Sequence, residues 1–195
     1  MKLSVFILAV IFPALVSAQQ IIYVKYDAIG DNNGISWQNA FTQLQPALQN
    51  AQYGDQIWVA AGTYLPTVGT DRNSTFFLPK GVSLWGGFSG IESTISQRNI
   101  SINLTVLSGD IGISGAYHDN VYHVVSILGG DYLTIIDGFS ITLGNADGLD
   151  EGGLLSRGYG RRHLFGCDNR SMLLSWEQNW SSFNSRCILL SRVWE

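Results

Sequence analysis

The sequence predicts an all-β fold that winds as a solenoid, and three observations support this prediction. Short apolar segments separated by Gly, Asn and Asp follow one another from Gln56 to Leu143. No second helical pattern interrupts them, which argues against a doubly wound α/β sheet. If the strongest segments form one wall, they are spaced more widely than the about 8–12 residues typical of sandwich hairpins. The centres of that predicted wall lie near Val59, Leu84, Val106, Val125 and Ile141.

The first expected elements are a strand and a helix joined by a turn-rich stretch. The segment Ile21–Tyr26 is β-branched and aromatic, and the Asp- and Asn-rich stretch 27–34 follows it. Over residues 42–51, apolar residues recur at helical spacing, with Thr42 as the expected N-cap. Pro46 falls in the first turn, where proline is tolerated, and Gly54 ends the helical region.

A series of short strands follows, and two of them show a clear alternation. Ile57 and Val59 share one face of their strand. The residues expected on one face of the later strand are Val82, Leu84, Gly86 and Phe88. Trp58 and Trp85 therefore lie together on the opposite face. The strands expected in this region are Gln56–Ala60, Phe76–Leu78, Val82–Phe88, Thr105–Leu107, Val121–Leu128, Leu133–Ile136 and Phe139–Leu143.

Composition and charge limit the classes of partner. The chain has 195 residues, of which 46% are hydrophobic and 13% charged, so it is not a disordered polyelectrolyte. Its formal net charge of -4 gives no reason to expect a phosphate backbone or an anionic membrane as partner, because both require clustered Lys and Arg. Nucleic acid is therefore not an expected partner, and no cofactor is expected either.

Residues 1–18 read as a secretory signal peptide. Lys2 precedes an apolar run that is broken by Pro13, and small residues come just before Gln19. The run is too short for a bilayer anchor, which needs about 20 apolar residues. We expect cleavage after Ala18, no transmembrane segment after that cleavage, and a secreted or cell-surface location.

The tail 149–195 differs in composition from the region 19–148. Leu, Ser and Arg supply 20 of the last 45 residues, against 24 of the 132 residues from Gln19 to Asp150. Because each of these amino acids has six codons, we hypothesise a frameshift near Gly148 to Gly153, which would make the chain truncated. The alternative is a genuine solenoid cap, since terminal repeats are atypical. Cys167 and Cys187 would then be a candidate disulfide.

Several segments together resemble one family. They are Ser36–Phe41, Leu44–Leu48, Gly54–Tyr64, Gly81–Phe88, Leu107–Asp110 and Ile136–Thr142. As a set, they are similar to the N-terminal part of exported right-handed parallel β-helix proteins of the pectin-lyase-like superfamily, above all the surface or secreted proteins of Bacteroidetes-type bacteria. The resemblance covers residues 21 to 148. It implies an N-terminal cap made by the first strand and the helix, followed by the first coils, where the relatives continue for many more.

Two loop motifs have simpler explanations than ligand binding. Gly86–Gly90 resembles a phosphate-binding glycine loop, but no apolar helix follows it, so tight turning is favoured. The oxygen-rich residues Asp27 and 31–33 depart from the EF-hand spacing and lack a closing Glu, so turn chemistry is favoured over Ca²⁺ binding.

His118 and His123 would lie on opposite faces of an extended segment, which favours solvated histidines over a metal site.

The carboxylates Asp110, Asp131 and Asp137 sit at strand ends, where a β-helix lyase could hold Ca²⁺ beside a basic residue. Structural roles at turns are favoured, because the few basic residues lie far from them in sequence. No catalytic residue and no metal ligand is therefore predicted. Trp58 and Trp85 are candidates for stacking on sugar rings, and the alternative is that both pack under a neighbouring segment.

The sequence thus leads to a non-enzymatic, adhesin-like or glycan-binding scaffold, with extracellular polysaccharide as the expected partner. Two alternatives stay open. One is a polysaccharide lyase or glycoside hydrolase on the same fold, since β-helices carry both binding and catalysis. The other is a truncated product without function.

Overall fold

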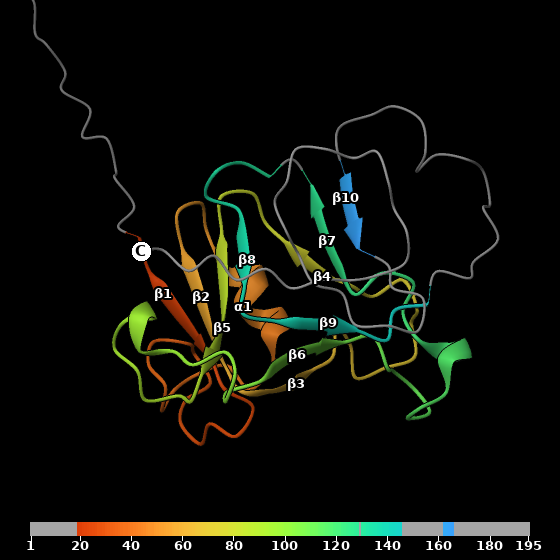
Figure 1. Ribbon diagram of the computed structural model, residues 1–195, viewed down its shortest axis with the longest axis horizontal. Coiled ribbons are helices and arrows are strands. Elements are labelled where there is room, and N and C mark those ends of the chain that lie inside the picture. Colours follow the sequence, from red (N-terminus) through yellow and green to blue (C-terminus); the bar gives the residue numbers. More distant parts are fainter. Residues whose placement is uncertain (1–18, 129, 146–161, 166–195) are drawn as a thin grey trace, which may run out of the picture.

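The computed structural model describes residues 19–128, 130–145 and 162–165 of the chain (Figure 1). Short strands dominate this part, together with one α-helix and two 3-10 turns. The strands are β1 (Ile21–Val24), β2 (Gln56–Ala60), β3 (Gly62–Tyr64), β4 (Phe76–Leu78), β5 (Ser83–Phe88), β6 (Thr105–Ser108), β7 (Val125–Leu128), β8 (Ile135–Asp137), β9 (Ser140–Thr142) and β10 (Arg162–Phe165). The helices are α1 (Leu44–Asn50), η1 (Ile95–Gln97) and η2 (Tyr117–Asp119).

The strands form three sheets, and every pair but one is parallel. The first sheet has the order β1-β2-β5-β8, the second β3-β6-β9, and the third β10-β7-β4. Only β10 runs antiparallel, against β7. The chain visits the three sheets in turn, through β2, β3 and β4 and then through β5, β6 and β7 (Figure 1). The predicted mostly β fold with parallel sheets and little helix is confirmed, and the arrangement is compatible with a β-helix.

The segments predicted to form one wall belong to three sheets. Val59 and Leu84 lie in neighbouring strands of the first sheet. Val106 and Ile141 lie in the second sheet, and Val125 lies in the third. The prediction of a single wall was wrong because each turn of the chain contributes strands to different sheets. Equal hydrophobicity along the sequence does not reveal which sheet a strand joins.

Glycines at the corners allow the chain to change sheet. Gly62 opens β3 directly after β2 with φ 150°, and Gly138 separates β8 from β9 with φ 82°. Both values lie in a region that glycine adopts readily and other residues rarely do. At Gly138 there is also no room for a side chain, because an added Cβ would come within 2.7 Å of the Gly86 carbonyl oxygen. The close approach of Gly138 to Gly86 therefore requires glycine at that corner.

Element boundaries agree with the sequence in part. β2 and β4 have the predicted limits, whereas the predicted strand 121–128 shortens to β7, and β3 was not predicted. The helix α1 is also shorter than predicted, and its N-cap is Gln43, which makes no side-chain capping bond. Thr42, the expected cap, instead bonds through both its N–H and its hydroxyl to Asn32 Oδ1, at 2.8 and 3.3 Å. A long-range contact has thus replaced the local cap.

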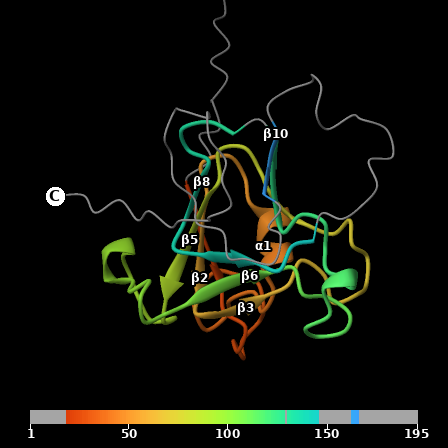
Figure 2. The ribbon, with the colours of Figure 1, turned by 45° about the vertical axis from the view of Figure 1, so that its right-hand side comes forward.

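The inward face of the first sheet is a column of aliphatic side chains in register. Ile22 pairs with Ile57, Ile57 with Leu84, and Leu84 with Ile136. Ile57 is fully buried and Leu84 is 1% exposed. These residues belong to one core with buried residues of the other two sheets, and α1 packs against β1, β2 and β4 (Figure 2). The predicted alternation is confirmed for Ile57, Val59 and Leu84.

The prediction for Phe88 was wrong because of a bulge. The register between β2 and β5 shifts between Trp58 and Ala60, so that Ala60 pairs with Phe88. Gly87, with φ 91°, lies at this irregularity. A bulge interrupts the period-2 alternation of a strand. Phe88 consequently stacks on Trp58, with ring centroids 4.7 Å apart, although simple alternation would have separated the two faces.

Several predictions concern residues outside the described part of the chain. The signal peptide 1–18 with its cleavage site at Ala18 lies there, and so do Cys167 and Cys187. Of the tail 149–195, only the backbone of β10 is described. These predictions stay predictions.

Truncating the inward column should destabilise the fold. Leu84→Ala removes a buried side chain between Ile57 and Ile136, and such substitutions cost about 2–5 kcal/mol through lost burial and the cavity left behind. Urea denaturation of the purified protein, followed by circular dichroism, measures the loss. The matched control is Phe77→Ala in β4, whose side chain is 47% exposed. Equal destabilisation by both variants would contradict the assignment of Leu84 to the core.

Candidate functional site

The outward face of the first sheet carries aromatic and charged residues in register. Tyr23 pairs with Trp58, Trp58 with Trp85, and Trp85 with Asp137. The predicted juxtaposition of Trp58 and Trp85 on one face is therefore present in the structure. Side chains paired in this way on adjacent parallel strands lie about 4.8 Å apart. This outward column is the first candidate site.

Trp58 is buried within the outward column. Its side chain is 3% exposed, and it is surrounded by the rings of Tyr23 at 5.8 Å, Trp37 at 6.5 Å and Phe88 at 4.7 Å. Its indole N–H donates to Gln56 Oε1 at 2.9 Å. A sugar ring would need an exposed aromatic face, so Trp58 and Trp85 do not form an open stacking platform. The packing alternative describes the position of Trp58.

The turn 89–92 binds the carboxylate of its own Glu92, and it also anchors Trp37, whose ring lies next to Trp58. Glu92 accepts hydrogen bonds from the backbone N–H of Ser89, Gly90 and Ile91, at 2.7 to 3.0 Å. The carbonyl of Glu92 accepts the indole N–H of Trp37 at 2.8 Å. The end of the glycine-rich stretch 86–90 thus contributes to a backbone nest of the kind that binds anions. The carboxylate of Glu92 occupies this nest, so the glycine-rich stretch has a structural role that does not involve a phosphate ligand.

The environment of Glu92 predicts how stability depends on pH. Burial alone would raise its pKa, but the hydrogen bonds from Ser89 and Ile91 outweigh burial and hold the pKa below the ordinary 4.5. A depressed carboxylate pKa contributes stability that is complete above the unfolded-state value and is lost as pH falls through the folded-state value. Part of the acid-induced loss of stability below about pH 4.5 should therefore come from Glu92.

Glu92→Gln tests this assignment. Replacing an acceptor oxygen by an amide NH₂ places a donor against backbone donors, which should cost about 1–3 kcal/mol at neutral pH. The variant should also lose less additional stability than the wild type between pH 5 and pH 3. Urea titrations at a series of pH values measure both effects. The comparison variant is Asp27→Asn, because Asp27 is exposed and its ion pair is with neighbouring Lys25.

Trp85, Arg98 and Asp137 form a second cluster, next to the first. The Arg98 guanidinium lies 4.9 Å from the centroid of the Trp85 ring and 2.6 Å from Asp137 Oδ1. Arg98 also donates to the Gly86 carbonyl at 3.2 Å. The side chains of Arg98 and Asp137 are 17% and 26% exposed. The fold therefore brings a basic residue to Asp137 that the sequence separation had concealed.

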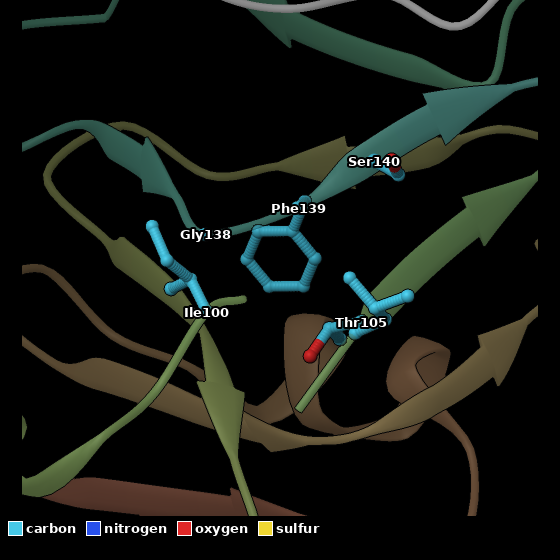
Figure 3. Close-up of a pocket in the computed structure, with 6 residues that line it drawn as sticks. Ile100, Thr105, Gly138, Phe139 and Ser140 are labelled. Atoms are coloured by element: carbon cyan, nitrogen blue, oxygen red, sulfur yellow. The ribbon is translucent and has the colours of Figure 1, made fainter. Parts of the chain in front are cut away.

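A small hollow adjoins this cluster (Figure 3). It has a volume of about 60 Å³, far below the roughly 300 Å³ at which ligand pockets begin. Figure 3 shows the ring of Phe139 beside Ile100 and Thr105 at this hollow. The lining residues are Ile100, Leu104, Thr105, Gly138, Phe139 and Ser140. Its size and mostly apolar lining do not fit a sugar, so Arg98 and Asp137 fit a structural ion pair rather than a substrate cleft.

The structural role of Arg98 can be measured. Arg98→Ala removes the contact with Trp85 and leaves Asp137 without its ion pair, which should destabilise the protein by about 1–2 kcal/mol. Arg98→Lys keeps the charge but loses the planar group over the ring, so its loss should be smaller. A double-mutant cycle with Asp137→Asn isolates the pair. Additive effects in that cycle would show that the ion pair does not contribute to stability.

Apart from the two histidines, the other polar residues that the sequence singled out have local partners. The Asp110 carboxylate accepts the Gly115 N–H at 3.0 Å, in a turn before η2. His118 is exposed within η2 rather than on an extended segment, and burial lowers the pKa of His123. Asp27 pairs with Lys25 at 2.6 Å. Asn32 and Asn33 accept backbone N–H groups, while the N–H of Asp31 donates to Asn39 Oδ1. Turn chemistry accounts for these contacts.

Three successive turns gather a cluster that the sequence did not single out. Tyr53 precedes β2, Lys80 precedes β5, and Asp131 and Tyr132 precede β8. The two tyrosines are 57% and 83% exposed. The Asp131 carboxylate raises the pKa of the Tyr53 hydroxyl. We call Tyr53, Lys80, Asp131 and Tyr132 the turn cluster. Tyrosines beside turn glycines were the only available signal in the sequence, and it is a weak one.

The described residues contain neither a metal-binding cluster nor a membrane-spanning helix. No group of three or more His, Cys, Asp or Glu side chains is arranged there to hold a metal ion. No helix in the same part of the chain has both the length and the hydropathy needed to cross a bilayer. Comparisons of the chain with protein-family models, curated proteins and solved structures give no match. Support for a function therefore comes from the chain itself.

Proposed function

We propose that this protein is an exported, non-enzymatic β-helix scaffold that binds extracellular glycans. The scaffold would be the right-handed parallel β-helix of pectin-lyase-like proteins, secreted or displayed at the cell surface. The N-terminal signal sequence supports the location, and the resemblance of residues 21 to 148 supports the family.

The strand order supports the β-helix part of the proposal. Each sheet adds its next strand from the following turn of the chain, as in β2-β5-β8 and β3-β6-β9. Equivalent strands pair in parallel, for example Phe76 of β4 with Val125 of β7. A parallel β-helix requires this cyclic order.

The observation that carries the binding function is the exposure of tyrosine rings on rigid stacked turns. Tyr53 and Tyr132 are more than half exposed, whereas Trp58 and the Phe88 ring stacked on it are buried. Exposed aromatic faces next to hydrogen-bonding groups are suited to sugars, which present both apolar C–H faces and hydroxyls. The chain provides this combination at the turn cluster.

The carboxylates support binding over catalysis. Lyase chemistry needs a free base next to a group that stabilises charge. Asp110 is bonded to its own turn, Asp131 accepts the Leu133 N–H at 3.0 Å, and Asp137 is paired with Arg98. These hydrogen bonds and this ion pair give each carboxylate a structural role. The polysaccharide lyase or hydrolase is therefore the second candidate function.

One experiment separates the two functions. The purified protein is incubated with a panel of soluble neutral and acidic polysaccharides, and binding is measured by affinity electrophoresis. The same mixtures are followed for reducing ends and for the ultraviolet absorbance of unsaturated uronate products. The proposal predicts retarded migration with at least one glycan and no product. Product formation would establish the enzyme alternative, and the absence of both signals would remove the glycan proposal.

A further inference from the structure

We infer that the turn cluster binds a neutral polysaccharide, with Tyr53 and Tyr132 contacting the sugar rings and Asp131 accepting bonds from sugar hydroxyls. The inference rests on the proposed glycan-binding function and assigns it a site and a ligand class. It moves the expected stacking residues from Trp58 and Trp85 to two tyrosines on the turns.

Backbone and side-chain bonds fix the three turns relative to one another. The N–H of Gly54 donates to the Gly81 carbonyl at 2.9 Å, and the N–H of Gly81 donates to Thr134 Oγ1 at 2.8 Å. Ser83 Oγ also donates to the Leu133 carbonyl at 2.8 Å. Each bond links one turn to the next, so residues at the tips keep a constant spacing. A binding site on such a frame loses little conformational entropy when a ligand binds.

The ring of Tyr53 packs against the backbone of Gly81. Gly81 has φ 75°, and a Cβ added there would lie 2.2 Å from Tyr53 Cδ2. The tyrosine ring therefore lies directly on the backbone of the next turn. More than half of the side chain still faces solvent. This is the arrangement that stacking on a sugar requires, because the ring is supported and remains accessible.

Asp131 supplies an oriented, ionised acceptor beside the rings. It accepts hydrogen bonds from the Leu133 N–H at 3.0 Å and from Thr134 Oγ1 at 3.2 Å. Burial acts to raise its pKa, but the Leu133 N–H and the hydroxyls of Tyr53 and Thr134 together lower it. Tyr132 also raises the pKa of the Tyr53 hydroxyl. The bonds from Gly54 and Gly81 hold together the turns that carry Tyr53, Asp131 and Tyr132, so the carboxylate and the two exposed rings belong to one set of joined turns.

The charges of the turn cluster favour a neutral ligand. The ammonium of Lys80 acts on Asp131, so the cluster contains one charge of each sign. Arg72 and Arg98 are engaged elsewhere, on Tyr122 and Trp85. A uronate chain would bring repeated negative charge to Asp131, and among the described residues Lys80 is the cation placed to offset that charge. Neutral hexose polymers avoid that repulsion and still offer hydroxyl donors.

The test uses variants of the full chain with a neutral β-glucan, a neutral galactomannan and polygalacturonate as probes. Tyr53→Ala and Tyr132→Ala should each weaken binding to a neutral polymer at least tenfold, and Asp131→Asn should weaken it several-fold. The matched control is Tyr117→Ala, since Tyr117 is 49% exposed but lies on η2. Circular dichroism and urea midpoints verify that each variant is folded. Tyr132→Ala is the variant expected to disturb folding least, because Tyr132 is more exposed than Tyr53.

The outcomes distinguish the site from the function. Loss of neutral-glycan binding in the Tyr53 and Tyr132 variants, with Tyr117→Ala unchanged, supports the inference. Unchanged neutral-glycan binding in folded Tyr132→Ala and Tyr53→Ala would overturn the site while the proposed function stands. Binding of polygalacturonate alone would overturn the ligand class but not the glycan function. Binding of none of the probes would overturn the inference, and the wider glycan panel then decides the proposed function separately.

Discussion

The parallel register of the first sheet is the constraint on which the rest of the structure depends. Once Ile57 pairs with Leu84, the alternation of the strand obliges Trp58 to pair with Trp85. A slip of one residue would place the indoles in the core and the aliphatic side chains outside. The burial of the aliphatic column therefore selects the register, and the register in turn determines which side chains are available on the surface.

Two polar side chains near the stacked strands find their partners in the turns. Glu92 fills the backbone nest of its own turn, and Thr134 accepts the N–H of Gly81 from the neighbouring turn. Buried polar groups without partners are costly, so these bonds are part of the condition for close stacking. They also make the turns rigid. Rigid turns can present side chains at defined positions, which is the property that the proposed binding function needs.

The aromatic residues divide into two sets with different physical roles. Trp37, Trp58 and Phe88 cover the outside of the first sheet, where their large apolar area stabilises the contact between the N-terminal segment and β5. Tyr53 and Tyr132 lie at turn tips and remain exposed. Aromatic content alone does not separate these sets, because the separation depends on whether another segment covers the ring. The covering segment here is held by the bond from Trp37 to Glu92.

The sequence by itself determined the strand-rich class, the limits of β2 and β4, and the opposition of Ile57 and Trp58, because these depend on local alternation and on glycines between strands. It did not determine the number of walls, the bulge at Phe88 or the contact between Arg98 and Asp137. It also did not determine which aromatic rings are exposed. These features arise where segments distant in the chain come into contact. Only the tertiary structure determines such contacts, because they depend on how the strands stack in the sheets and not on any local sequence pattern.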